Sequence, residues 1–158
     1  MPIELDKTDR LLLQALQANA RLTSGELAQL AHVSQSPAWR RVKRMEEEGI
    51  VGGYHAALNR RALGYGVLAF VLVSIDHQNE MASHAFEKAA VAIPEVVMFH
   101  AISGPEDFML VVVARDLDHY SEVLQKSLHR LPGVRRVHTH FSLQDFKGQI
   151  GQLPVPVD

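Results

Sequence analysis

The stretch TSGELAQLAHVSQSPAWRRVKRMEEEGIV, residues 23–51, decides the fold of the N-terminal part of this chain. Its pattern indicates two short helices joined by a tight turn, and the second helix carries four positive charges and no negative one through Met45. This is the layout of a helix-turn-helix, in which the second helix lies in the DNA major groove and the first crosses the backbone. The sequence therefore predicts a DNA-binding unit.

Capping residues mark where the helices of this unit begin and end. Asp6 is a suitable N-cap for a preceding helix through LLLQALQAN, and Thr23 or Ser24 can cap the next helix. After a turn at residues 32–33, Ser34 is the expected N-cap of the basic helix, and Gly49 is suited to end it. The sequence thus predicts three helices, followed by a short strand or wing over residues 50–57.

The basic helix has one apolar and one polar face. At about 100° per residue, Ala38, Val42 and Met45 share the side that must pack on the other helices. Arg41 lies near that stripe and is expected to brace the fold, whereas Trp39 either packs against the wing or touches a base. We expect DNA contacts from the outward residues Ser34, Gln35, Ser36, Trp39, Arg40, Lys43 and Arg44.

Overall charge at first argues against a nucleic-acid partner, because the net charge is −2. The distribution changes that view: residues 1–60 hold eight Lys or Arg against seven Asp or Glu, and the remainder holds eight against eleven. A clustered basic patch is what phosphate attraction requires, although the alternative for such a run is a solvated charged face.

Cysteine is absent, and the longest apolar run, residues 66–75, is about half of the ~20 residues that span a bilayer. No signal-peptide pattern is visible at the start. We therefore expect a cytoplasmic protein without a membrane partner.

Long apolar runs replace the helical periodicity after residue 64. Four runs indicate strands, two amphipathic stretches indicate helices, and their order is βαββαβ, the ferredoxin-like arrangement. The predicted strands are 67–75, 96–103, 108–114 and 134–143, and the helices are 79–93 and 118–131. The fold class is α+β, with a winged-helix-like helix-turn-helix domain (1–53), a strand or linker (54–64), a ferredoxin-like domain (65–147) and a C-terminal tail (148–158).

The first three strands are apolar at nearly every position, which indicates burial on both sides. Two helices can cover only one face of the sheet. We expect the other face to pack on a second copy and form a two-fold dimer.

Nine histidines raise the question of a metal site. His138 and His140 point to the same side of one strand, and His100 could lie on a neighbouring strand. Spacing fixes no third ligand, and scattered strand histidines usually satisfy local hydrogen bonds. We therefore predict no metal and no cofactor.

Four segments together resemble the Lrp/AsnC (feast/famine) family of transcriptional regulators over residues 5–147. They are LDKTDRLLLQALQANAR, ELAQLAHVSQSPAWRRVKRMEEEGIV, IPEVVMFHAISGPEDFMLVVV and LPGVRRVHTHFSL. The resemblance implies a DNA-binding domain and a RAM-type domain that dimerises, assembles into octamers or related rings, and binds a small effector, usually an amino acid.

By this resemblance the effector pocket lies at the contact between dimers. It implies effector-binding roles for Ser103, Gly104, Glu106 and Asp107 in one loop, with Thr139 on the last strand. A glycine-containing loop can present backbone N–H groups to a carboxylate, and Asp107 and Thr139 offer acceptors for an ammonium group.

Three positions depart from the family pattern. His32 stands where the turn usually has Gly, so the turn is either strained or not left-handed. Trp39 is larger than is common there, and Glu106 replaces a frequent aromatic residue, which makes a cationic ligand, or none, conceivable.

The sequence therefore predicts a sequence-specific, homo-oligomeric transcriptional regulator that binds operator DNA, responds to a small effector and is not an enzyme. One alternative is an enzyme of the tetrapyrrole (siroheme) decarboxylase type, which resembles this two-domain architecture. Another is a non-specific architectural DNA-binding protein.

Overall fold

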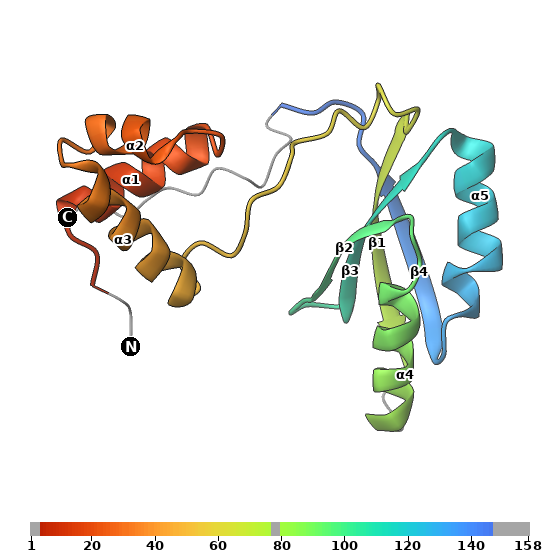
Figure 1. Cartoon of the computed structure of the whole chain (residues 1–158). Coiled ribbons are helices and arrows are strands. Elements are labelled where there is room, and N and C mark those ends of the chain that lie inside the picture. Colours follow the sequence, from red (N-terminus) through yellow and green to blue (C-terminus); the bar gives the residue numbers. More distant parts are fainter. Residues whose placement is uncertain (1–3, 77–79, 147–158) are drawn as a thin grey trace. The chain divides into compact units, whose positions relative to one another are not determined.

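The computed structural model describes residues 4–76 and 80–146 of the chain, so the predicted tail over 148–158 lies outside the described residues. Within them the chain forms two compact units, residues 4–57 and 58–146. Figure 1 labels their elements, and each unit is described by itself.

Three helices make up the N-terminal unit: α1 (Lys7–Ala18), α2 (Ser24–Leu30) and α3 (Gln35–Glu47). The predicted caps of the first two are confirmed. The Asp6 side chain accepts from the Asp9 backbone N–H in a reciprocal capping box, and Thr23 does the same with Glu26. Leucines of α1 and α2 pack with small and flexible side chains of α3 to form one core: Leu12, Leu16, Leu27, Ala28, Ala31, Ala38 and Met45.

Both ends of α3 lie where the sequence places them. Ser34 is the N-cap residue, although its hydroxyl makes no capping hydrogen bond. At the other end Gly49 has φ +73°, its N–H donates to the Glu46 carbonyl, and the Ile50 N–H donates to the Met45 carbonyl. This pair of bonds is a Schellman motif, which needs a residue in the left-handed region and so explains the glycine.

The turn between α2 and α3 places a non-glycine residue in the left-handed region. His32 has φ +55°, and the next N–H, that of Val33, donates to the Ala28 carbonyl at 3.0 Å. Of the two alternatives that the sequence left for this turn, the strained one is therefore observed.

The predicted strand or wing over residues 50–57 is wrong. Residues 52–57 have no regular secondary structure and are exposed. A strand needs a neighbour to satisfy its backbone groups, and no other segment of the described chain pairs with this one. The later part of the expected strand or linker over 54–64, by contrast, contains an ordered turn, because the Asn59 side chain accepts from the N–H groups of Arg61 and Ala62.

Four antiparallel strands in the order β2-β3-β1-β4 form the sheet of the C-terminal unit and confirm the predicted βαββαβ arrangement. The elements are β1 (Val67–Ile75), α4 (Glu80–Val91), β2 (Val96–Ala101), β3 (Phe108–Ala114), α5 (Leu117–Lys126), the short 3₁₀ helix η1 (Leu128–Arg130) and β4 (Val134–Phe141). None of the helices in the described residues is long and apolar enough to cross a membrane.

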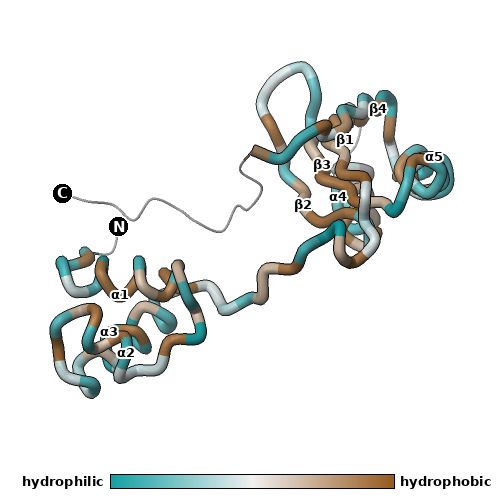
Figure 2. Tube along the Cα trace, turned by 90° about the horizontal axis from the view of Figure 1, so that it is seen from above, coloured by the Kyte–Doolittle hydropathy of each residue, from teal (hydrophilic) through white to brown (hydrophobic). Residues whose placement is uncertain are grey.

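The two faces of this sheet differ. On one face Val71 and Leu110 are fully buried in a cluster with Phe86 of α4 and Tyr120 of α5. The register places Phe70 and Leu72 on the opposite face, where Phe70 is 39% exposed. We call this second face the open face. Figure 2 shows the hydrophobic colouring continuing along β1 and β3, as expected for strands that are apolar on both sides.

Candidate functional site

The outward face of α3 holds the predicted DNA contacts. Every one of them is exposed: Ser34, Gln35, Ser36, Trp39, Arg40, Lys43 and Arg44. They share this face because Ala38 and Met45 turn the opposite side of the helix into the core, where they are 1% and 0% exposed. The helix therefore presents a continuous polar and basic surface.

Trp39 lies at the border of this surface and of a cavity of about 290 Å³ that is also lined by Tyr54. The Lys43 Nζ sits 5.0 Å from the centre of the Trp39 ring. The Tyr54 hydroxyl donates to Glu46 at 2.6 Å, and burial together with this hydrogen bond raises the pKa of Tyr54 to about 12. The indole thus lines a cavity together with the segment that follows α3, and it stays 54% exposed.

Two acidic residues of α1 and its cap meet two arginines of α3. Arg41 Nη1 lies 2.6 Å from Asp6 Oδ2 and 2.9 Å from Asp9 Oδ1, so Arg41 braces the fold as expected. A backbone hydrogen bond from Asp9, assisted by Arg41, lowers the pKa of Asp6. The paired carboxylates in turn raise the pKa of Arg41.

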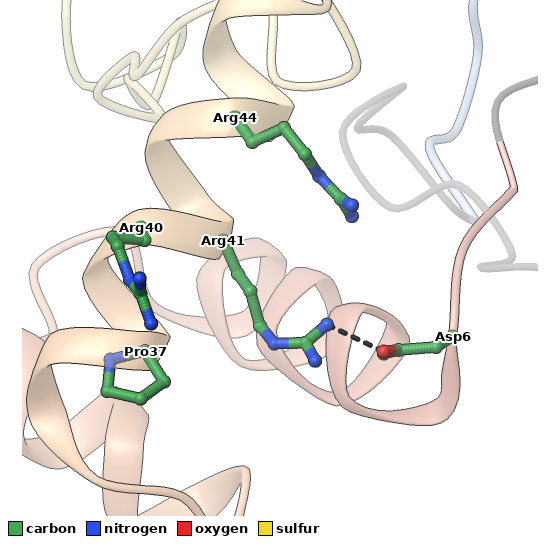
Figure 3. A pocket seen from close by; sticks show the side chains of 5 residues that line it. All are labelled: Asp6, Pro37, Arg40, Arg41 and Arg44. Atoms are coloured by element: carbon green, nitrogen blue, oxygen red, sulfur yellow. Dashed lines mark hydrogen bonds and ion pairs between the residues drawn. The ribbon is translucent and has the colours of Figure 1, made fainter.

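Arg44 was expected to point outward only, but its guanidinium group also pairs with carboxylates of the N-terminal unit. Its Nη2 lies 2.7 Å from Asp9 Oδ2, and its Nε lies 3.8 Å from Glu48. The side chain keeps 43% of its surface exposed, but its guanidinium is drawn toward α1 because Asp9 is a buried carboxylate that needs cationic partners. Figure 3 shows Arg40, Arg41 and Arg44 around the resulting cavity, with Arg40 beside Pro37.

Sequence reasoning missed the part that Asp9 plays. A signal was present, because Asp6 and Asp9 are three apart on one helix turn and so are Arg41 and Arg44. Only the packing of α1 against α3 shows that these pairs meet.

The loop at residues 103–107 holds four of the predicted effector residues. Ser103 and Gly104 are exposed, and Gly104 has φ +138°, a conformation that favours glycine. Asp107 ties the loop to the central strand: its N–H donates to the Val73 carbonyl at 3.0 Å, and its Oδ2 accepts from the Ile75 N–H at 2.8 Å. The Asp107 carboxylate is therefore already engaged within the chain.

Glu106 and Thr139 are drawn to opposite faces of the sheet. Glu106 Oε1 lies 3.4 Å from Nδ1 of His138, whereas the Thr139 hydroxyl lies 2.5 Å from the Tyr120 hydroxyl of α5. Neighbouring residues of β4 alternate between the faces, so the structure does not gather the five predicted effector residues around one cavity. Both cavities described here lie in the N-terminal unit.

The histidines of the sheet lie on the open face but not together. His138 and His140 pair with Leu72 and Phe70, while His100 pairs with Met109 on the far side of β3. Strands β2 and β4 are the two edges of the sheet. Among residues 4–76 and 80–146, no group of three His, Asp or Glu side chains could hold a metal ion.

A three-helix unit with an exposed basic helix, followed by a four-stranded sheet with helices on one face, is the architecture of a class of DNA-binding transcriptional regulators. Residues 5–51 match winged helix-turn-helix DNA-binding domains, and residues 68–150 match the Lrp/AsnC ligand binding domain. The chain belongs to the Lrp/AsnC family.

Named relatives agree with this assignment. The chain is 35% identical over 145 residues to a leucine-responsive regulatory protein of Rhizobium meliloti, covering 92% of this chain and 93% of the relative. It is 37% identical over 141 residues to the Bkd operon transcriptional regulator of Pseudomonas aeruginosa, covering 89% and 92%. A Neisseria meningitidis transcriptional regulator solved in complex with L-Met superposes with a TM-score of 0.91 at 35% identity, covering 96% and 97%.

Proposed function

We propose that α3 reads an operator in the DNA major groove and that an amino acid, bound at the loop of residues 103–107, regulates this binding. The observation that carries the proposal is the exposed polar face of α3, which offers hydrogen-bond donors and acceptors beside clustered positive charge. We also propose that the protein is cytoplasmic and that it is not an enzyme.

We assign each predicted DNA-contacting residue to base edges or to phosphates from its side-chain chemistry and its position on α3. Ser36 and Arg40, in the N-terminal half of α3, contact base edges, while Lys43 and Arg44 contact phosphates. Ser34, Gln35 and Trp39 contribute at the start of the helix and at its border. Of the arginines, Arg40 is the better base reader, because Arg44 is shared with Asp9.

An amino-acid effector is supported by the Neisseria relative, which was solved with L-Met. Ser103 and Gly104 are exposed residues, and backbone N–H groups of such a loop suit a carboxylate. Because Asp107 and Thr139 have partners within the chain, the ammonium group needs a rearrangement or groups from a second copy.

Oligomerisation is supported by the open face of the sheet, where Leu72 and Met109 are half-buried next to the exposed Phe70. We propose that this face forms a homodimer that assembles further, to an octamer. Two recognition helices would then meet half-sites about 34 Å apart on the duplex.

Selection of binding sites from a random duplex library, followed by gel-shift titration with each of the twenty amino acids, tests the proposal. We expect a roughly palindromic consensus whose affinity changes with at least one amino acid. Arg40→Ala should weaken operator binding about tenfold, equivalent to a lost base contact, with the oligomer mass unchanged. Equal affinity for selected and random DNA would favour an architectural protein and contradict the proposal.

A further inference from the structure

We propose that the cleft lined by Arg40, Arg41 and Arg44 binds a backbone phosphate of the DNA, and that Asp6 occupies it as a competing anion in the free protein. This inference rests on the proposed function, because the phosphate belongs to the duplex that α3 reads. We call this place the arginine cleft.

The arginine cleft has ample room for a phosphate group, and three guanidinium groups line it. Its volume is about 420 Å³, and it is lined by Asp6, Pro37, Arg40, Arg41 and Arg44 (Figure 3). Except for Asp6, its lining residues follow one another at helical spacing along α3, and one of them, Arg40, is also assigned to a base edge. A phosphate bound here would thus lie at the flank of the reading face, where the DNA backbone passes.

Asp9 organises the cleft from beneath. It is 1% exposed, and its two carboxylate oxygens hold Arg41 at 2.9 Å and Arg44 at 2.7 Å. Both guanidinium groups are therefore oriented before any ligand arrives, which lowers the entropy lost on binding. Arg41 and Arg44 remain 33% and 43% exposed, so each keeps surface available for a second anion.

Asp6 stands where a phosphate oxygen would stand. Its Oδ2 lies 2.6 Å from Arg41 Nη1, the separation of a short charge-assisted hydrogen bond. Its side chain is 53% exposed, whereas Asp9 is enclosed, so Asp6 is the carboxylate that solvent or DNA can displace. With Asp6 in place, the three arginines face Asp6, Asp9 and, 3.8 Å from Arg44, Glu48, so removing the Asp6 charge leaves the cleft with a net positive charge.

Asp6→Asn tests the competition, because asparagine keeps the N-cap of α1 and removes only the charge. We expect this variant to bind the operator about fivefold more tightly than wild type, the equivalent of one exposed ion pair. Glu4→Gln is the matched control, since Glu4 is exposed near the same terminus and does not line the cleft. Glu4→Gln should leave affinity within twofold of wild type.

Replacing single operator phosphates by neutral methylphosphonates then locates the contact. At one phosphate in each half-site the replacement should weaken operator binding by wild type, weaken binding by Asp6→Asn more, and leave binding by Arg44→Gln unaffected, since Arg44 is the lining residue assigned to a phosphate. Lys43→Gln, on the same helix but outside the cleft lining, should respond at a different phosphate.

The outcomes separate this inference from the proposed function. A wild-type chain that binds no duplex overturns both. A wild type that binds, with Asp6→Asn no tighter than Glu4→Gln or with no phosphate shared by the Asp6 and Arg44 variants, overturns the arginine cleft alone.

Discussion

The recognition face of α3 and the loop of residues 103–107 are both candidate binding surfaces, but they are built differently. The seven residues assigned to DNA, six polar ones and Trp39, come from one segment, residues 34–44, and all are exposed. The five effector residues come from a loop and from β4, and hydrogen bonds commit Asp107 to β1 and Thr139 to α5. A site carried by one helix face is complete as soon as that helix folds, whereas a site assembled from separate elements needs something more to bring its groups together.

The variant with the largest expected effect tests whether the recognition face of α3 also depends on contacts with α1. Asp9→Asn should lower the free energy of unfolding of the N-terminal unit by about 2–3 kcal/mol, because a buried carboxylate with two charged hydrogen bonds is lost. Denaturant titration followed by the fluorescence of Trp39, the single tryptophan, measures it. Asp6→Asn serves as the exposed control, and similar losses in both variants would contradict the central role of Asp9.

A second experiment tests whether the loop is tied to the sheet. Asp107→Ala should cost the C-terminal unit about 1–2 kcal/mol and speed hydrogen exchange of the Ile75 amide, which loses its acceptor. Glu106→Gln, next to it in the same loop, should change neither quantity. Unchanged Ile75 protection in Asp107→Ala would mean that the carboxylate is available to a ligand.

A substitution in the turn between α2 and α3 should have a smaller effect, and it should stabilise the protein. His32→Gly should raise the stability of the N-terminal unit by about 1 kcal/mol, because φ +55° strains any residue with a Cβ. His32→Ala keeps the Cβ and should not be stabilised. The midpoints of thermal unfolding of wild type, His32→Gly and His32→Ala measure the effect. Equal midpoints for the glycine and alanine variants would contradict backbone strain at residue 32.

The smallest expected effect is on the stability of the protein at acidic pH. Because the folded-state pKa of Asp6 is lowered, its contribution is fully present above the unfolded pKa of about 4 and is lost as the pH falls through the folded pKa. Wild type should therefore lose slightly more stability than Asp6→Asn between about pH 5 and pH 2. Parallel loss in the two proteins would contradict a contribution of the Asp6 charge through the backbone N–H of Asp9 and through Arg41.

The fold was largely predictable because its signals are local. Strands 67–75 and 108–114 were predicted with the bounds that the structure has, since both are apolar runs without helical periodicity. The end of α3 at Gly49 also followed from one residue type. The strand over 50–57 failed because its residues suit an extended chain, while strand formation depends on a partner that the described chain does not supply.

The candidate sites were less predictable because their side chains contact residues that are far away in the sequence. The alternation of β4 places His138 and Thr139 on different faces, and the register decides which of them meets Glu106. Likewise Arg44 was assigned to the outward face by its helical angle, yet a carboxylate 35 residues away draws it back. Long, flexible side chains reach beyond the position that periodicity assigns to their Cα.

The two hydrogen bonds of Asp107 have a mechanical consequence. They join the 103–107 loop to consecutive pleats of β1, at Val73 and Ile75, beside the point where the register with β4 shifts. A displacement of this loop therefore breaks two hydrogen bonds to β1, one of the two inner strands of the sheet.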